Sequence, residues 1–390
     1  MGFPSFGFRL ASLGDDAMNL MRWRGMWAVL LGGLGLAMPA VAQVLDKLPL
    51  PPAPAAVADA PVEPAKTPSL LPSPDATPLV PVVPGASSLI DNSPAAGEGE
   101  SKSGLWVLDG EYLLMAARQS NQQYAVLGTN PVLGPVGSIK AVDDSGYHSG
   151  FRLGASYRFP GEDVEVAFRY TFLHAADNGG AGAPPGQVLF ATETHPGLVV
   201  QVQSANARDA VNLNVLDLEI AQRFDISSSM IGRVFAGPRF ASIDQKSDIT
   251  YAGGDANRDD IRRRLFFNGG GVRAGGEVQW KFWDHLGTYF RGSGSMMAGR
   301  FRSEYSETAN NLPVVNVSEK FNRVVPNIEM GMGLQYQKGD WRFAVGYEFI
   351  TYFGMVDNVD FVSDANPAKI GRKTGNLSLD GIVFRSEYAF

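Results

Sequence analysis

The side chains best suited to acid–base chemistry are two histidines with acidic residues close by in the sequence. Asp143 and Asp144 precede His148, and Asp177 follows His174. A histidine within hydrogen-bond reach of a carboxylate can act as a general base and activate a water molecule. Such spacings are common in polar loops, and the sequence does not predict that the five groups meet. We therefore expect no catalytic residues and no enzyme.

Two further motifs could bind a cofactor or a metal ion. The segment 269–274 spells the G-x-G-x-x-A pattern of dinucleotide-binding loops, but no helix pattern follows it. The segment 255–259 resembles the start of a calcium-binding loop. Asp260 stands where that loop needs glycine, and Phe266 stands where it needs a bidentate glutamate. We predict no cofactor and no dedicated metal site, and we leave open a loose contact of this acidic segment with divalent cations.

The composition narrows the function classes further. The 390 residues include no cysteine, which excludes disulfides, thiolate-bound metals and a thiol nucleophile. The 33 basic and 40 acidic side chains give a net charge of −7 without a dense basic run, which argues against nucleic acid as a partner. The sequence is nevertheless rich in large apolar groups, with 23 Phe, 12 Tyr and 6 Trp.

The N-terminal region reads as a secretory signal peptide. Arg22 and Arg24 precede the apolar stretch 25–38, and an A-x-A cleavage pattern follows at 40–42. A single membrane anchor is the alternative, but the apolar stretch is shorter than the about 20 residues that a spanning helix needs. We predict a signal peptide over residues 1–42, in which residues 1–20 are an upstream extension.

Residues 43–104 form a second compositional region. About half of the 25 prolines lie here among Ala, Val, Ser and Asp, so the segment cannot bury a core. Proline fixes φ and removes a backbone donor, which favours an extended polyproline II chain. We predict a disordered linker, and a tether to the cell wall or to a partner is the alternative.

Residues 105–390 show a hydrophobic pattern of period two. In Val164–His174 and again in Trp341–Phe349, apolar side chains alternate with polar or small ones. Alternation of this kind indicates β-strands with one apolar face. Ten such strands are predicted, and most are long enough for the about 9 to 11 residues that cross a bilayer. They lie at about 105–117, 147–159, 164–175, 213–224, 231–243, 265–282, 286–301, 323–337, 341–353 and 377–390.

The predicted connections alternate between short and long. Short turns are expected at 160–163, 225–230, 283–285 and 338–340, and long loops at 118–146, 176–212, 244–264, 302–322 and 354–376. Short turns on one side and long loops on the other are typical of outer-membrane barrels. The sequence therefore predicts an all-β, antiparallel, up-and-down transmembrane barrel of about ten strands. Two segments, Gln187–Glu193 and Leu198–Gln203, form either a protruding hairpin or two further spanning strands, which would make twelve.

A soluble β-sandwich would also alternate, but its polar face would be wet. Here Arg and Glu are interleaved with Gly, Ala and Ser, as expected for a confined lumen, and the basic and acidic members are nearly balanced. Asp109, Glu111 and Lys281 belong to the same face. The residues predicted to line the lumen are Arg152, Arg158, Glu165, Arg169, Asp217, Glu219, Arg223, Arg233, Arg239, Arg273, Glu277, Arg291, Glu329, Arg342, Glu348, Arg385 and Glu387.

Aromatic residues are expected at the membrane interface, because their rings are amphipathic. The candidates near the periplasmic strand ends are Trp106, Tyr157, Phe159, Trp280, Phe282, Trp341, Tyr388 and Phe390. Phe384, Tyr388 and Phe390 alternate along the last predicted strand. This pattern resembles the C-terminal signal that the outer-membrane barrel assembly machinery reads.

The folded region resembles the pore-forming Legionella-type major outer membrane protein family, which includes similar planctomycete outer-membrane β-barrel proteins. The resemblance implies a channel without a defined catalytic site, in the outer membrane of a Gram-negative cell. The segments that carry it are Trp106-x-Leu108-x-x-x-Tyr112-Leu113, Ser149–Gly154, Leu216–Glu219, Gly237–Ala241, Val325–Glu329 and Gly346–Phe349.

Together these features predict a porin-like barrel for passive diffusion of small hydrophilic solutes. Eight strands leave a lumen that side chains just fill and 16 leave an open channel, so the pore of a ten-stranded barrel is expected to be narrow. Two alternatives are a non-conducting barrel that anchors the envelope and an adhesin that acts through long loops. A rim protease of the kind found among ten-stranded barrels is a minor alternative. Expected partners are membrane lipid and lipopolysaccharide, the assembly machinery, and peptidoglycan through the linker; no oligomeric state is predicted.

Overall fold

The computed structural model describes residues 104–128, 135–362 and 368–390. The predicted signal peptide and, except for Gly104, the predicted linker lie outside these residues. The described chain is all-β, and it contains no helix that could span a membrane. Its strands are β1 (Leu105–Gln119), β2 (Gln123–Gly128), β3 (Gly137–Ala141), β4 (Tyr147–Arg158), β5 (Val164–Gly182), β6 (Val188–Ala191), β7 (Gln201–Val202), β8 (Ser204–Ser227), β9 (Met230–Gly253), β10 (Ala256–Lys281), β11 (Leu286–Ala309), β12 (Leu312–Lys338), β13 (Trp341–Phe361) and β14 (Ile370–Ala389).

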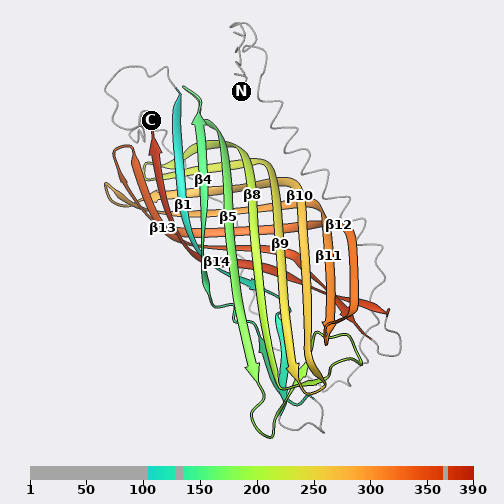
Figure 1. Cartoon of the computed structure of the whole chain (residues 1–390). Helices are drawn as coiled ribbons and strands as arrows, with labels where there is room; N and C mark the ends of the chain where they lie inside the picture. Colours follow the sequence, from blue (N-terminus) through green and yellow to red (C-terminus); the bar gives the residue numbers. More distant parts are fainter. Residues whose placement is uncertain (1–103, 129–134, 363–367) are drawn as a thin grey trace, which may run out of the picture. The chain divides into compact units, whose positions relative to one another are not determined.

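Ten of these strands close into one antiparallel barrel (Figure 1). Their order is β1-β14-β13-β12-β11-β10-β9-β8-β5-β4, and β4 pairs back onto β1. The first and last strands pair from Val107↔Ala389 to Gln119↔Leu377. The ten-stranded, up-and-down barrel predicted from the sequence is confirmed.

The other four strands form a small separate sheet in the order β3-β2-β6-β7. The two segments left open by the sequence lie here, and β6 and β7 pair as a short hairpin through Leu189↔Val202 and Phe190↔Gln201. Strands this short cannot cross a bilayer, which needs about 9 to 11 residues. The twelve-stranded alternative is therefore wrong.

Two of the predicted long loops do not exist. In place of a loop at 244–264, β9 and β10 continue and meet at a tight turn after Gly253, which has φ +79°. In place of a loop at 302–322, β11 and β12 meet at Asn310 and Asn311, with φ of 51° and 65°. Positive φ at both central residues is the geometry of tight hairpin turns. The predicted loop at 176–212 is likewise occupied by the ends of β5 and β8 and by the small sheet.

The loop predictions fail because the strands exchange their polar and apolar faces partway along. In β9, Val234 and Phe240 face outward and are exposed, while Arg239 faces inward and is buried. Beyond Ser242 the outward side chains are polar, and the inward Ile243 and Ile249 are buried. Where apolar side chains face outward, the wall is suited to contact lipid. Where they face inward and polar side chains face outward, the wall is suited to contact water. The apolar belt therefore marks the membrane-spanning part, and the barrel wall continues beyond it.

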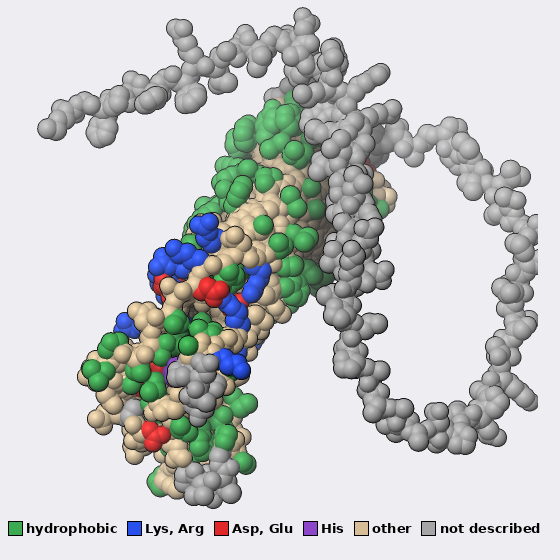
Figure 2. All heavy atoms as spheres, turned by 90° about the vertical axis from the view of Figure 1, so that its right-hand side faces the viewer, with side chains coloured by type: hydrophobic (Ala, Val, Ile, Leu, Met, Phe, Trp, Pro, Cys, Tyr) green, Lys and Arg blue, Asp and Glu red, His purple; other side chains and the backbone are tan. Residues whose placement is uncertain are grey.

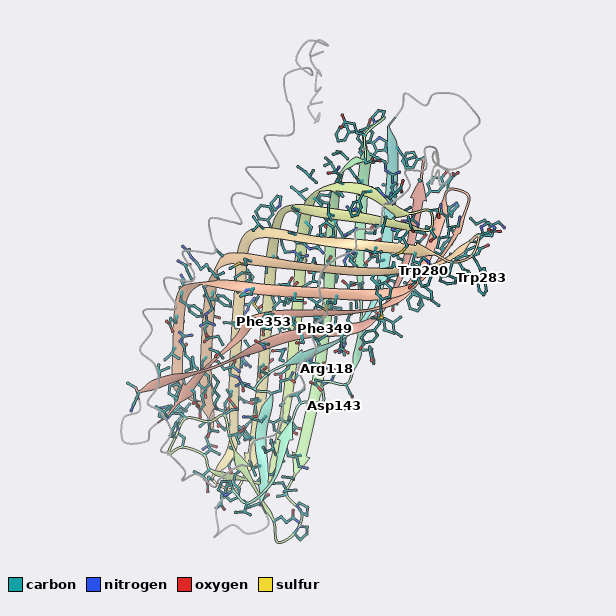
Figure 3. All side chains as sticks on the ribbon, turned by 180° about the vertical axis from the view of Figure 1, so that it is seen from behind. Arg118, Asp143, Trp280, Trp283, Phe349 and Phe353 are labelled. Carbon is teal, nitrogen blue, oxygen red and sulfur yellow. The ribbon has the colours of Figure 1, made fainter. Side chains whose placement is uncertain are left out.

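The start of β1 and the end of β14 lie together at one end of the barrel, called here the terminal end. The amide of Trp106 donates to the carbonyl of Phe390 at 3.0 Å, and the amide of Phe390 donates back at 2.9 Å. Trp280 lies near the end of β10, and Trp283 lies in the turn between β10 and β11 (Figure 3). Figure 2 shows hydrophobic side chains covering one part of the barrel wall and Lys and Arg side chains beside them.

Two apolar clusters fill the interior beyond the charged part of the lumen. The first is built from β1, β5 and β8 to β14, and includes Leu113, Phe267, Met297 and Tyr352. The second lies farther along, and packs the small sheet against Ile249, Ile261, Tyr305 and other inward residues of the long strands. Beyond the apolar belt, these clusters form a core like that of an ordinary water-soluble protein.

Candidate functional site

The candidate site is the charged interior of the membrane-spanning barrel. Because side chains alternate along a strand, every second residue of the belt points inward. Arg, Glu and Asp at these positions come from all ten barrel strands, and most of them are buried. Lys281, predicted on the same face, continues the inward alternation and is exposed at the terminal end of β10.

One group of ion pairs centres on Glu111 of β1, which is 3% exposed. Its carboxylate accepts from Arg385 Nε at 2.7 Å and also pairs with Arg152. Arg152 Nη1 reaches Glu348 at 3.1 Å, and its Nε donates to Thr171. The network thus joins β1, β4, β13 and β14 by fully paired charges.

A second group of ion pairs joins the neighbouring strands β8 and β9 and also links both of them, through Glu329 and Arg273, to strands that are not their neighbours. Arg239 of β9 donates two bonds to Asp217 of β8, at 2.6 and 2.7 Å, and it also pairs with Glu329 of β12. Arg273 Nη2 donates to Glu329 at 2.6 Å, and the same guanidinium pairs with Glu219. Since β10 and β11 lie between β9 and β12 in the barrel order, the pair of Arg239 with Glu329 bridges the interior.

Several residues of this network were not predicted from the sequence. Phe235 points inward, with the guanidinium carbons of Arg273 and Arg233 at 4.8 and 5.1 Å from its ring centre. Asn327, 1% exposed, accepts from Arg239 Nη1 at 2.8 Å. Phe235 follows Arg233 at the period-two spacing, so that spacing could have placed it inside. The partner of Asn327 depends on how the barrel closes, and no local pattern shows this.

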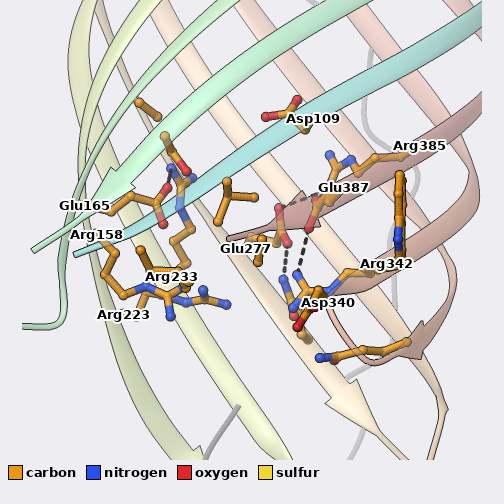
Figure 4. A pocket seen from close by; sticks show the side chains of 18 of the residues that line it. Asp109, Arg158, Glu165, Arg223, Arg233, Glu277, Asp340, Arg342, Arg385 and Glu387 are labelled. Carbon is orange, nitrogen blue, oxygen red and sulfur yellow. Dashed lines mark hydrogen bonds and ion pairs between the residues drawn. The ribbon is translucent and has the colours of Figure 1, made fainter. Parts of the chain in front are cut away.

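A vestibule of about 90 Å³ opens in the interior at the terminal end (Figure 4). This volume has room for a few water molecules, each of which takes about 30 Å³. Arg342 pairs with Glu387 at 3.1 Å on one wall, and Arg233 pairs with Glu165 at 2.9 Å on another. The lining residues Arg158 and Arg223 form no ion pair with a described residue.

The first apolar cluster follows the ion pairs along the lumen. Phe267 and Phe301, both 0% exposed, pack with ring centres 4.8 Å apart. Met297 and Val325 are also 0% exposed. An ion that entered the vestibule would meet paired charges first and then this dry layer.

The predicted acid–base residues come together only in part. His148 Nε2 lies 3.0 Å from Asp177 Oδ1 at the far end of the lumen. His174 instead bonds Asn212 at 2.6 Å on the outer face. Asp143 accepts from the amide of Ser145, and Asp144 lies 3.5 Å from Arg118 (Figure 3). The described residues contain no group of three His, Asp or Glu side chains arranged for a metal ion.

A buried carboxylate pair lies beyond the membrane belt. Asp259 and Glu307 are both 0% exposed, and the oxygens of Asp259 have no hydrogen-bond donor among the described residues. Burial, followed by the charge of Glu307, raises the pKa of Asp259 to about 7. Burial also raises the pKa of Glu307, whose carboxylate accepts from Tyr305 and from the amide of His195.

Sequence comparison matches residues 101–390 to the family described as Legionella pneumophila major outer membrane protein precursor. The chain belongs to this family. The resemblance found in the sequence is thereby confirmed, and the protein is an outer-membrane β-barrel of the Legionella major outer membrane protein family. No curated protein matches the chain.

Several solved structures of outer-membrane proteins are similar to this chain, and their sequence identity to it is low. The outer membrane protease OmpT from Escherichia coli has a TM-score of 0.40 and 10% identity, and the match covers 74% of this chain and 98% of OmpT. A deletion mutant of the monoaromatic hydrocarbon channel TodX has a TM-score of 0.30 and 10% identity, with 74% and 69% covered. Ail, the attachment invasion locus protein of Yersinia pestis, has a TM-score of 0.21 and 12% identity, with 74% and 99% covered.

Proposed function

We propose that this protein is a closed, non-conducting outer-membrane barrel that serves as a structural anchor of the cell envelope. The observation that carries the proposal is the filled interior, in which a layer of paired charges is followed by an apolar layer. An anchor needs a barrel that is stable in the membrane and a wall that projects from it, and the long strands β8 to β12 support the proposal because they continue beyond the apolar belt.

The energetics of the interior support a sealed barrel. Arg239 and Glu329 are buried and paired, so an ion could enter only by separating charges that stabilise each other. Removing one member of a buried pair leaves a charge that costs several kcal/mol. The dry layer around Phe267 adds the cost of stripping water from the ion itself.

Passive diffusion of small hydrophilic solutes is the second candidate. The vestibule favours it, because Arg158 and Arg223 form no ion pair with a described residue and are available to a solute from the periplasm. Conduction would then require the ion pairs and the apolar layer to rearrange. Neither candidate assigns catalysis to the protein, and the hydrogen-bonded His148 and Asp177 are then structural.

Conductance in planar bilayers separates the two candidates. Insertion is first verified by the resistance of the folded barrel to unfolding in gel electrophoresis without heating. The anchor proposal expects no stable current steps from the wild-type chain, and steps on replacing Phe267 and Phe301 together by Ala. Wild-type steps whose ion selectivity changes in an Arg158→Gln/Arg223→Gln variant would overturn it in favour of diffusion. The matched control is Arg258→Gln, because Arg258 lies at an exposed hairpin tip far from the lumen.

The remaining expectations about partners belong to this proposal. Phe384 and Phe390 are exposed on the lipid side of β14, as recognition by the assembly machinery would require. Contact with peptidoglycan would fall to the segment before the barrel. Cross-linking of that segment to the cell wall in intact cells tests the anchoring role directly, since a diffusion pore has no need of it.

A further inference from the structure

A band of basic side chains lies on the outer wall where the apolar belt ends. These side chains, called here the basic band, are Lys246 of β9, Arg262 and Arg264 of β10, Arg300 and Arg302 of β11, and Lys320 of β12. All six are exposed. Figure 2 shows the corresponding gathering of Lys and Arg beside the hydrophobic surface. Asp244, Asp248, Asp260 and Glu304 are the acidic residues on the same outward rows, so the six basic side chains outnumber them and the band carries excess positive charge.

The pairing register places like charges directly opposite each other. Lys246 faces Arg264 across β9 and β10, and Arg302 faces Lys320 across β11 and β12. Directly opposed residues have Cβ atoms about 5 Å apart, and like charges there are destabilising. An anion between the two cations would relieve this repulsion.

Only one of the two facing pairs has, within the described chain, an anion that contacts both of its cations. Asp244 lies 2.8 Å from Arg264 and 3.6 Å from Lys246, and so bridges that pair. Arg302 contacts Glu304 at 2.5 Å on its own strand, but Lys320 forms no ion pair with a described residue. Arg300, two positions from Arg302 on the same face, also forms none.

The apolar wall below these residues identifies what supplies the missing anion. Cross-strand neighbours Ala298 and Val324 follow Arg300 toward the belt, and Met296 comes next, 61% exposed. A lipid whose acyl chains lie along Met296 and Val324 would bring its headgroup to Arg300, Arg302 and Lys320. We propose that these three residues bind the phosphate of an anionic lipid headgroup in the leaflet on this side of the membrane.

The opposite side of the barrel lacks this arrangement. Arg118 of β1 lies at a similar place beyond the belt, but Asp380 holds it at 2.8 Å. Its neighbours on the outer wall make neutral hydrogen bonds, such as Tyr112 to Ser149 and Tyr170 to Asn214. The lipid site is therefore confined to one side of the barrel, over β11 and β12.

The test uses the full chain in a neutral detergent, with lipid A, which carries two phosphates, as the probe. Binding is measured by the concentration dependence of the melting temperature and by native mass spectrometry. We expect an Arg300→Gln/Arg302→Gln/Lys320→Gln variant to bind lipid A at least tenfold more weakly. The control variant Arg258→Gln/Lys369→Gln removes two exposed charges far from the belt and should bind as the wild type does. The charge-conserving Arg300→Lys/Arg302→Lys variant should retain most of the binding, which separates loss of the site from loss of folding.

Two further arms distinguish the source of the phosphate. Phosphatidylcholine, whose headgroup is neutral overall, should give no comparable shift, and salt at 1 M should weaken lipid A binding because exposed charges are screened. Equal binding by the triple variant and the wild type would overturn the proposal. So would a shift of the same size with inorganic phosphate alone, because the anion would then be free phosphate. None of these readouts depends on whether the barrel conducts.

Discussion

At the scale of single residues, the paired charges of the lumen decide the stability of the membrane-spanning part. Arg239, 2% exposed, is held by Asp217 and Glu329, and its removal would leave these two buried carboxylates with Arg273 as their remaining partner. We expect Arg239→Ala to lower the free energy of unfolding by about 3 to 5 kcal/mol. Urea unfolding in lipid vesicles measures this. Arg262→Ala is the control, because Arg262 is exposed on the outer wall, and a change above about 0.5 kcal/mol there would contradict the reasoning.

The carboxylate pair beyond the belt makes a second prediction at this scale. Burial holds the pKa of Asp259 at about 7, well above its ordinary value of 3.8. A raised carboxyl pKa means that the folded state favours the protonated group, so its contribution is full below about pH 4 and is lost as the pH rises through 7. The loss from Asp259 is bounded at about 4 kcal/mol.

Asp259→Asn should remove most of this pH dependence, since the amide cannot ionise. Hydrogen exchange of the β6 and β7 amides between pH 5 and pH 9 provides the measurement. Wild-type protection should fall with rising pH, and protection in the variant should change less. Asp248→Asn, on the exposed outer face, serves as the matched control. Protection that rises with pH in the wild type would reverse the sign and refute the prediction.

The inward position of a charged residue could be predicted from the sequence, but its ion-pair partner could not. Period two is enough to put Arg239 and Glu329 on the same face of their strands. Their contact depends on the stagger of the closed barrel, which brings β9 and β12 together across the lumen. The same limit applies to His148. It contacts Asp177 because both side chains point inward from the adjacent strands β4 and β5, and it lies apart from His174 because that side chain points outward.

At the scale of elements, the exchange of faces along the long strands explains which boundaries could be predicted. Within the belt, outward apolar residues such as Phe240 and Val234 mark each strand clearly. Beyond the belt, the outward Asp244 and Lys246 are polar, so the sequence predicted a loop there. Ile243 and Ile249 nevertheless continue the alternation on the inner face. The sequence therefore predicted the number of strands and their direction, and it underestimated their length.

The turn between β9 and β10 couples these strands to the small sheet. Gly254 has φ +69°, and a Cβ there would lie 2.2 Å from the carbonyl oxygen of Gln201. The next residue, Asp255, accepts from the amides of Val200 and Gln201 through its side chain. Gly254→Val should therefore displace β7 and expose Phe190 to chymotrypsin.

Gly186 offers a matched control for that substitution. It has φ +82°, but a Cβ there would meet nothing within 4 Å. Gly186→Val should cost only the backbone strain of about 1 to 2 kcal/mol and leave β7 in place. Equal cleavage rates in the two variants would show that the clash with Gln201 has no part in docking the hairpin.

At the scale of the whole molecule, the described barrel should project from one side of the membrane. The 11 residues of β9 beyond Ser242 rise roughly 30 Å, at about 3.4 Å per residue with a tilt of about 40°. Atomic force microscopy of reconstituted membranes should record a protrusion of about this height. The opposite side carries short turns and should stay near the lipid surface, so equal heights on both sides would be inconsistent with this wall.

The closing of β1 on β14 sets the order of events in folding. Glu111 and Arg385 are 274 positions apart in the chain, yet they form a buried ion pair in the finished barrel. Contacts between such distant residues are slow to form, because a long stretch of chain must be ordered before they stabilise it. Until β14 arrives, β1 and β13 each present an open row of backbone donors and acceptors to the surroundings. Assembly in the membrane must therefore shield two unpaired edges until the last strand joins the first.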